Sequence, residues 1–199
     1  MNYFVTGIDT DSGKTLVSAI LCEALAFDYW KPVQAGFPKD SDTVKLLSPN
    51  TIVHPEQYVL NTPASPHASA KIDSINITLD SFILPKKHGL VVEGAGGCLV
   101  PLNDTNFVID LFPKLNAQII LVADLYLGSI NHTLLSAELL KSRNYAVRGI
   151  IFNGPFNPES ERIILKHTGY PCLLHITREA QITTETVKKY SVLIRQTLL

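Results

Sequence analysis

The chain has 199 residues, a length that suits one domain spanning residues 1–199, with 46% hydrophobic and 18% charged residues. This composition is typical of a folded globular protein and excludes a mainly disordered chain. The formal net charge of −1 lacks the basic excess that a nucleic acid or an anionic membrane would require, so we expect neither as a partner.

Short apolar, β-branched runs alternate with amphipathic patterns along the chain, which predicts alternating strands and helices. Residues 48–66 look irregular, and residues 94–97 are expected to turn sharply. The order predicts an α/β fold in a single domain, with a mostly parallel sheet covered by helices on both faces. The predicted strands are residues 3–6, 29–33, 90–93, 118–123, 147–152 and 172–176, and the predicted helices are residues 14–26, 42–47 (capped by Ser41), 130–143, 158–167 and 184–198.

The cysteines and the apolar runs indicate the compartment. Cys22, Cys98 and Cys172 are far apart and odd in number, so neither a disulfide framework nor a zinc site is expected. The run at residues 119–123 is too short to cross a bilayer, and the N-terminus lacks the basic region of a signal peptide. We therefore expect a cytoplasmic protein with reduced cysteines.

The segment after the first predicted strand, residues 7–15, reads Gly-Ile-Asp-Thr-Asp-Ser-Gly-Lys-Thr. Its Gly-Lys-Thr end, between a strand and a helix, matches a nucleotide phosphate-binding loop (P-loop). Gly13 would let backbone N–H groups approach phosphate oxygens, Lys14 would place a charge on them, and Thr15 would offer a hydroxyl to Mg²⁺. Five residues separate Gly7 from Gly13, whereas the standard P-loop pattern has four, so this loop is a variant. The alternative interpretation is a glycine-capped turn before a helix.

Charged residues stand at other predicted strand ends, where ligands bind in such sheets. Lys31 is either a cation facing a transferred phosphoryl group or a solvated strand end. Glu93 ends an apolar run and precedes Gly-Ala-Gly-Gly, which places a carboxylate where Mg²⁺ ligands sit and lets another molecule approach the backbone. Asp42, taken alone, is explained as an acidic residue that complements a helix dipole.

Three further polar segments have two interpretations each. His67, in Ser-Pro-His, is a base or, more commonly, an exposed loop histidine. Asn131 opens a helix that Ser129 or Asn131 itself could cap. Asn153, followed by glycine, forms a turn or presents an amide to a nucleotide base.

Taken together, these segments resemble the dethiobiotin synthetases, the ATP-dependent carboxylases and cyclases of biotin synthesis. The matching segments are residues 4–15, 31–33, 41–42, 65–67, 92–97, 101, 127–132 and 153. The family's loop has the same long spacing. The resemblance implies a P-loop NTPase type of fold and a homodimer. It also implies a reaction: 7,8-diaminononanoate, CO₂ and MgATP give dethiobiotin, ADP and phosphate through a carbamate and a carbamic-phosphoric anhydride.

The resemblance also assigns site residues. It implies that Lys14, Lys31 and Thr10 are catalytic and that Thr15, Asp42 and Glu93 hold Mg²⁺, with the 127–131 segment reaching across the dimer interface to the substrate. The implied nucleotide contacts are Asp11, Ser12, Gly13, Lys14, Thr15, Leu16, Asp42, Glu93, Gly94, Ala95, Gly96, Asn153 and Gly154. The implied substrate contacts are Thr10, Lys31, Ala35, Gly97, Leu127 and Asn131.

The sequence departs from the family pattern in two places. Ala35 stands where related enzymes often carry a serine or threonine hydroxyl near the carbamate. His175-Ile176-Thr177 stands where a Gly-x-Ile-Pro segment usually precedes the loop that contacts adenine. Both departures affect substrate and base contacts rather than the phosphate chemistry.

Two other functions are compatible with such a loop. An amidating relative would need a glutamine-cleaving Cys/His pair, and Cys98 and Cys172 have no such context. A nucleotide-switch ATPase of the partitioning type has a further lysine early in its loop, where this chain has Ile8 and Asp9. Such ATPases often end in a membrane-binding helix, but packing on the sheet explains the apolar face of residues 184–198 better.

Overall fold

The computed structural model describes residues 1–86 and 89–198 and is built around a parallel sheet. Seven strands pair in the order β4-β2-β6-β1-β7-β8-β9, and every pairing is parallel. This confirms the predicted α/β fold. The strands are β1 (Asn2–Gly7), β2 (Asp28–Trp30), β4 (Val53–His54), β6 (Leu90–Gly97), β7 (Ala117–Asp124), β8 (Val147–Asn153) and β9 (Cys172–Ile176).

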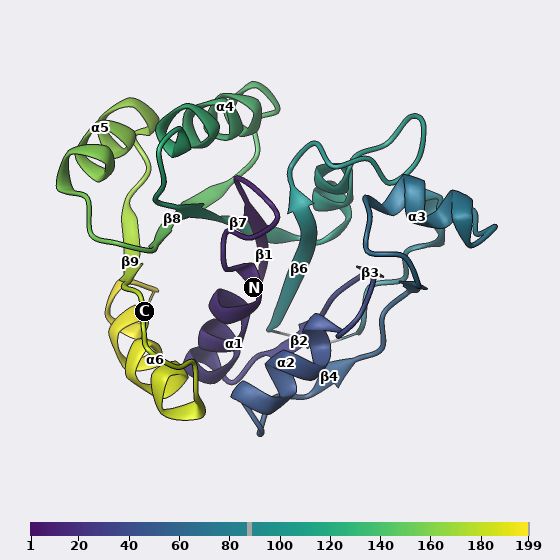
Figure 1. Cartoon of the computed structure of the whole chain (residues 1–199), viewed down its shortest axis with the longest axis horizontal. Helices are drawn as coiled ribbons and strands as arrows, with labels where there is room; N and C mark the ends of the chain where they lie inside the picture. The colour runs from purple at the N-terminus through teal and green to yellow at the C-terminus, as the bar shows by residue number, and fades with distance from the viewer. Residues whose placement is uncertain (87–88, 199) are drawn as a thin grey trace.

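Helices cover both faces of this sheet (Figure 1). In β1, Tyr3 and Val5 pack in a core cluster with α1 and α6, whereas Phe4 packs in the cluster of the opposite face. This alternation is the one expected for a strand buried on both sides. One face carries α1 (Lys14–Leu25), α2 (Asp40–Leu47) and α6 (Thr184–Leu198), and the other carries α4 (Ser129–Ser142) and α5 (Pro158–Thr168).

The strand register brings the charged residues together at one edge of the sheet. Val5 of β1 lies opposite Glu93 of β6, and Trp30 of β2 lies opposite Val92 of β6. Lys31, which follows Trp30, therefore comes beside Glu93, and the P-loop after β1 comes beside both. Parallel strands place their carboxyl ends at the same edge, which is where ligands bind in open α/β sheets.

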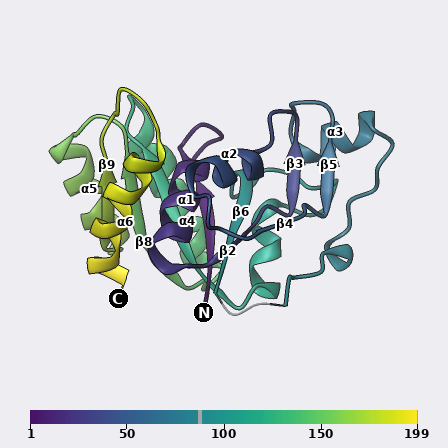
Figure 2. The ribbon, with the colours of Figure 1, turned by 90° about the horizontal axis from the view of Figure 1, so that it is seen from below.

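The predicted strand at residues 29–33 is wrong in its second half. The main-sheet strand β2 ends at Trp30, and after Lys31 and Pro32 the chain enters β3 (Val33–Ala35), which pairs with β5 (Tyr58–Leu60). Proline has no backbone N–H to donate to a neighbouring strand, so β2 ends before Pro32. Figure 2 shows β3 and β5 side by side, apart from the main sheet and next to α3 (Pro66–Ile72).

Other boundaries also differ from the predictions. Residues 94–97 do not turn sharply; β6 continues through Gly97, with a bulge where the register of its pairing with β1 shifts. Ser41 does not cap α2, because the helix begins at Asp40 with Lys39 in the cap position, and Ser41 donates its hydroxyl to Glu56. Residues 48–66 contain β4 and β5 rather than irregular chain alone. Two 3-10 helices, Leu79–Ser81 and Val108–Lys114, complete the fold.

Within residues 1–86 and 89–198, no helix combines the length and the apolar character that a bilayer span requires.

Candidate active site

The P-loop at residues 7–15 is held by its own polar groups. The Ser12 hydroxyl donates to the Asp9 carbonyl oxygen at 3.0 Å, and the Thr10 backbone N–H donates to Asp9 Oδ1 at 2.6 Å. Gly13 has φ +92°, a left-handed conformation that favours glycine. A Cβ on Gly13 would lie 2.2 Å from Asn153 Nδ2, so the position has no room for a side chain.

Lys14, the first residue of α1, turns its side chain back over the loop. Its Nζ donates to the carbonyl oxygens of Asp9 at 2.8 Å and Thr10 at 2.7 Å. The pKa of Lys14 is lowered to about 8, chiefly by burial and also by the neighbouring Lys31 charge, although the Glu93 charge opposes both effects. Lys14 is therefore a buried amine whose charge a bound phosphate would stabilise.

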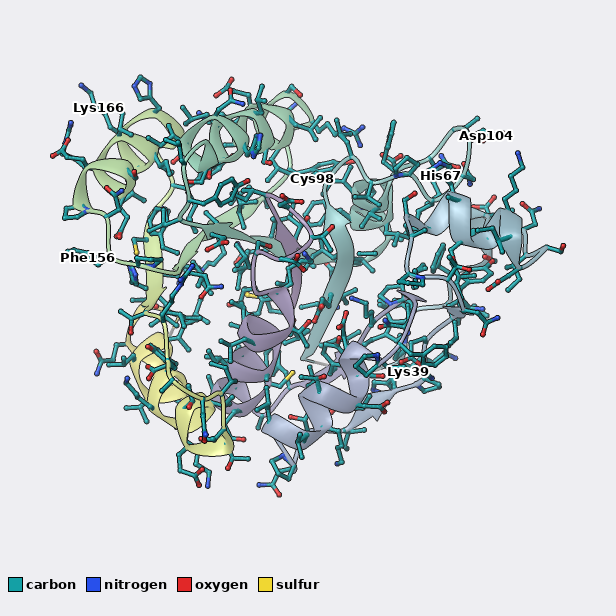
Figure 3. The ribbon with its side chains drawn as sticks, viewed as in Figure 1. Lys39, His67, Cys98, Asp104, Phe156 and Lys166 are labelled. Carbon is teal, nitrogen blue, oxygen red and sulfur yellow. The ribbon has the colours of Figure 1, made fainter. Side chains whose placement is uncertain are left out.

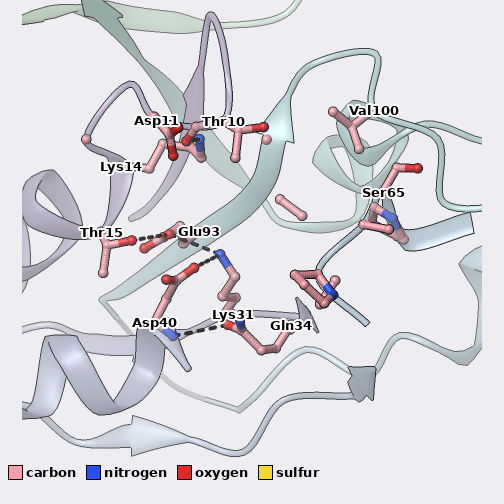
Figure 4. A pocket seen from close by; sticks show the side chains of 17 residues that line it. Thr10, Asp11, Lys14, Thr15, Lys31, Gln34, Asp40, Ser65, Glu93 and Val100 are labelled. Atoms are coloured by element: carbon pink, nitrogen blue, oxygen red, sulfur yellow. Dashed lines mark hydrogen bonds and ion pairs between the residues drawn. The ribbon is translucent and has the colours of Figure 1, made fainter. Parts of the chain in front are cut away.

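The carboxylate of Glu93 lies at the centre of the site, where only 1% of the residue is exposed. Glu93 Oε1 accepts from the Thr15 hydroxyl at 2.9 Å and from Lys31 Nζ at 3.1 Å, and Oε2 accepts from the Tyr29 hydroxyl at 2.9 Å. Burial, and then the Glu93 charge, raise the pKa of Tyr29 well above its ordinary value, so the phenol stays a donor. Side chains from α1, from β2 and from the residue that follows β2 thus fix the orientation of this carboxylate. Figure 4 shows the contacts of Glu93 with Thr15 and Lys31.

Lys31 joins two carboxylates. Besides its contact with Glu93, its Nζ forms an ion pair with Asp40, the first residue of α2. Burial alone would lower the pKa of Lys31, but the charges of Glu93 and then Asp40 outweigh it and raise that pKa above 10.5. Gln34 fixes Asp40 in turn, because its Oε1 accepts the Asp40 backbone N–H at 3.1 Å. Lys31 is therefore a permanent cation at physiological pH.

A cavity of about 590 Å³ opens over these groups. Its volume falls in the range of about 300–1,000 Å³ that is usual for small-molecule sites. The P-loop and β6 form one wall, and the segment around β3 together with residues 63–66 forms the other (Figure 4). The cavity brings together these residues named from the sequence: Thr10, Asp11, Gly13, Lys14, Thr15, Lys31, Ala35, Glu93, Ala95 and Gly96.

Asp42, which the family resemblance assigns to a metal site with Thr15 and Glu93, does not line this cavity. It is exposed on α2, whereas Asp40 lines the cavity. Two residues along a helix are separated by about 200° of rotation, so the two acids face different directions. Because α2 begins at Asp40, two residues before the predicted start, the inward-facing acid is Asp40.

The implied substrate contacts Gly97, Leu127 and Asn131 also lie outside the cavity. Gly97 lines a neighbouring groove of about 370 Å³. Leu127 and Asn131 are exposed, the former fully so. Neither Ser129 nor Asn131 occupies the cap position of α4, which Gly128 takes with φ +107°.

Of the nucleotide contacts implied outside the cavity, some lie next to the P-loop and others are packed in the core. Asn153 Nδ2 donates to the Ser12 carbonyl oxygen at 3.0 Å, which joins the end of β8 directly to the P-loop. Gly154 follows with φ +108°. Leu16 packs against the core of the α1 face, and Gly94 is buried in β6. His67 is exposed, as expected, although it lies in α3 rather than in a loop.

Several lining residues were missed by the sequence reasoning: Gln34, Asp40, Pro63, Ala64 and Val100. Asp40 stands two residues before Asp42 in Lys-Asp-Ser-Asp, so an acidic pair at a helix start was visible in the sequence. Gln34 follows the Lys-Pro-Val segment and was within reach of the same argument. Pro63, Ala64 and Val100 carry no chemical signal that could have placed them here.

Comparison with known proteins shows what the chain is similar to. Residues 1–186 match the model of a family described as an AAA domain. The chain is 58% identical to the ATP-dependent dethiobiotin synthetase of Cytophaga hutchinsonii, with 96% of this chain and 95% of that protein covered. It is 46% identical to the synthetase of the same name from Christiangramia forsetii, covering 99% and 97%.

Solved structures share the fold at low sequence identity. A ParA family ATPase from Chlorobium tepidum superposes with a TM-score of 0.61 at 13% identity, covering 96% of this chain and 97% of that one. The septum site-determining protein MinD of Pyrococcus horikoshii, complexed with Mg-ADP, gives a TM-score of 0.58 at 15% identity, covering 99% and 95%. These likenesses support the P-loop fold and carry no argument about activity.

Proposed function

This chain belongs to the ATP-dependent dethiobiotin synthetases, and from that premise we propose how its residues serve the reaction. The enzyme is a cyclo-ligase that makes dethiobiotin by ATP-dependent carboxylation. The observation that carries the residue assignments is the cavity in which two buried lysines, Lys14 and Lys31, meet around Glu93. A nucleotide-switch function is less well supported, because the ATPases of that type are similar to this chain in fold alone.

The proposed reaction begins at the amines of 7,8-diaminononanoate. One amine attacks CO₂ and loses a proton, which gives a carbamate. A carbamate oxygen attacks the γ-phosphorus of ATP, and ADP leaves. The second amine then attacks the carbamate carbon and loses a proton, phosphate leaves, and the five-membered urea ring closes. Negative charge develops on carbamate and phosphate oxygens in these steps, so positioning and charge stabilisation are what the protein must supply.

The two lysines would stabilise charge on different groups. Lys14, at the start of α1 and in contact with the loop carbonyls, is suited to the transferred phosphoryl group. Lys31, kept charged by Glu93 and Asp40, is suited to the carbamate oxygen. Thr10 and Asp11 also line the cavity and would contact both substrates. Ala35 would contact the diamine without offering a hydroxyl.

Mg²⁺ fits the oxygen donors of this site. Thr15 Oγ1 and Glu93 Oε1 lie 2.9 Å apart, and Mg²⁺ in phosphoryl-transfer enzymes is commonly held by one or two carboxylates together with substrate phosphates. Thr15 and Glu93 would hold it, and it would supply charge neutralisation for the phosphate oxygens. Asp42 as a further ligand stays a prediction. Asp42→Asn tests it, because an unchanged Mg²⁺ concentration for half-maximal activity would remove Asp42 from the metal site.

The decisive experiment measures both products. The purified protein is incubated with 7,8-diaminononanoate, bicarbonate and MgATP, and ADP and dethiobiotin are quantified together. We expect the two to appear in equal amounts. ADP release without the ring product would overturn the proposed function. ADP release that does not depend on the diamine would favour a simple ATPase.

We further propose that the chain acts as a homodimer. Leu99 and Leu135 line the groove that Gly97 also lines and expose 50% and 62% of their surface, and Leu127, which precedes α4, exposes 103%. Exposed apolar residues gathered in this way favour a protein contact. In such a dimer, Asn131 would reach the substrate in the partner's cavity. Leu127→Asp should shift the mass measured by light scattering from dimer to monomer; a monomeric native protein would contradict the proposal.

A further inference from the structure

Tyr29, the middle residue of β2, carries a phenol that ends inside the protein, beside the cavity. No part of the residue is exposed, and it packs in the core cluster of the α1 face with Val44 and Val91. Its hydroxyl donates to Glu93 Oε2 at 2.9 Å. Glu93 lines the cavity and Tyr29 does not. The phenol therefore reaches the carboxylate from the core and not from the cavity.

The strand register explains how the phenol reaches this carboxylate. Tyr29 lies opposite Val91 in the parallel pairing of β2 with β6. Side chains two residues apart in a strand lie on the same face of the sheet, so Glu93 is the next residue along the face that Val91 shares. Two residues advance a strand by about 6.6 Å, a step that an aromatic side chain spans. A phenylalanine at position 29 would span the same step without offering a hydroxyl.

The two carboxylate oxygens of Glu93 have different partners. Oε1 accepts from Thr15 at 2.9 Å and from Lys31 at 3.1 Å, and both of these residues line the cavity (Figure 4). Oε2 accepts from Tyr29, whose pKa is raised chiefly by burial, so the phenol keeps the proton that it donates. Oε1 is therefore turned to the cavity, and Oε2 is held on the side of the core.

This division of the two oxygens suits one divalent cation better than another. Mg²⁺ requires near-ideal octahedral geometry and keeps several waters, so a single oxygen from a carboxylate is sufficient. Ca²⁺ takes six to eight oxygen ligands and often uses both oxygens of one carboxylate. Groups that hold a metal-binding side chain through a hydrogen bond typically change the metal affinity about 10–100-fold. A donor on Oε2 can therefore influence both the affinity for the cation and the choice of cation.

We propose that Tyr29 is a positioning residue for Glu93, which holds Oε2 in the core so that only Oε1 is offered to a divalent cation and Mg²⁺ is favoured over Ca²⁺. The proposal rests on the Mg²⁺ site of the proposed function, in which Thr15 and Glu93 would hold the ion. Tyr29 does not line the cavity, so it acts through Glu93 and not by contact with the nucleotide or the cation.

The test measures ADP binding to the full-length protein by calorimetry, in EDTA and at increasing concentrations of Mg²⁺ or Ca²⁺ at constant ionic strength. Tyr29→Phe keeps the ring and removes the donor. Tyr58→Phe is the matched control, because it removes a phenol that contacts Ser81, away from the cavity.

In Tyr29→Phe, we expect the Mg²⁺ concentration that gives half of the maximal tightening of ADP binding to rise about tenfold. The preference for Mg²⁺ over Ca²⁺ should shrink, because Oε2 is no longer held in the core. The ADP dissociation constant in EDTA should stay unchanged, because no cation is then bound. Tyr58→Phe should match the wild type in all three measurements.

Two results with Tyr29→Phe would overturn the proposal. One is a wild-type dependence on Mg²⁺ together with a lower melting temperature, because that outcome assigns the phenol a purely structural role. The other is an equal loss of ADP affinity with Mg²⁺ and with EDTA. If the variant does not fold, the wild type decides, since an equal response to Mg²⁺ and Ca²⁺ contradicts the proposed preference.

The same titrations separate this proposal from the proposed function. ADP binding that ignores Mg²⁺ in the wild type would overturn the metal site of Thr15 and Glu93, and the role of Tyr29 with it. ADP binding requires no diamine, so the effect of Tyr29→Phe is measured whether or not the protein forms dethiobiotin.

Discussion

Replacing Lys31 by methionine tests the charge arrangement at the centre of the site. Lys31 Nζ lies 3.1 Å from Glu93 Oε1, and only 4% of the residue is exposed. At that distance the attraction is about 5 kcal/mol for an effective dielectric constant of about 20. Removing one partner from a buried pair typically costs about 3–5 kcal/mol, because the remaining charge stays buried without compensation. We therefore expect Lys31→Met to lower the free energy of unfolding by about 3 kcal/mol at neutral pH.

The pH dependence of this difference has a definite sign. The pKa of Lys31 in the folded protein is raised above its ordinary value of 10.5, because Glu93 and Asp40 outweigh the effect of burial. Its contribution is fully present below pH 10.5 and is lost as pH rises through the higher folded-state pKa. The difference between wild type and Lys31→Met should therefore stay constant near neutral pH and shrink in strongly alkaline solution.

Urea unfolding and a product assay measure the two consequences. Turnover of Lys31→Met should fall by about 10²–10³, the usual loss when one preorganised charge-stabilising group is removed. Lys166→Met, on the exposed last turn of α5 and labelled in Figure 3, is the matched control and should retain wild-type stability and turnover. A Lys31→Met protein with both wild-type values would refute the reasoning.

Further substitutions and conditions probe the surrounding groups. Raising the pH through about 8 removes the proton of Lys14 in the free protein, so ADP should bind more weakly and with proton uptake; calorimetry showing constant affinity there would contradict this. Gly13→Ala would place a methyl group 2.2 Å from an amide nitrogen and should abolish measurable ADP binding, whereas Gly169→Ala, with no described atom within 4 Å, should cost only conformational strain of about 1–2 kcal/mol and keep binding. Tyr29→Phe removes the donor to Glu93 Oε2 and should lower the free energy of unfolding by about 1.5–3 kcal/mol; an unchanged urea midpoint would show that this hydrogen bond contributes nothing.

The meeting of Lys14, Lys31 and Glu93 could be predicted from the sequence because it follows from topology. Lys14 follows the loop after β1, Lys31 follows β2, and Glu93 ends the apolar first half of β6. Parallel strands place these positions near one edge of the sheet. No side-chain detail was needed. The phosphate loop was predictable for the same reason, since its residue types and its strand–loop–helix context are both local.

The orientation of α2 could not be predicted, because its start depends on distant residues. The Asp40 backbone N–H is bound by Gln34, six positions earlier, and Ser41 is bound by Glu56, fifteen positions later. Local capping rules favour Ser41 as the cap and so place the start of the helix two residues too late. The three-residue strands β3 and β5 were missed for another reason: they are too short to show a periodic pattern.

The separate β3–β5 ladder has an evolutionary consequence. The wall it supports, with Ala35 and residues 63–66, would contact the organic substrate in the proposed reaction, whereas the P-loop follows β1, which pairs with β6 in a different ladder. Amino-acid changes in β3 and β5 can therefore alter the selectivity for the organic substrate without changing the contacts of the P-loop with the nucleotide. Substrate selectivity can thus change during evolution while the phosphoryl-transfer site is conserved.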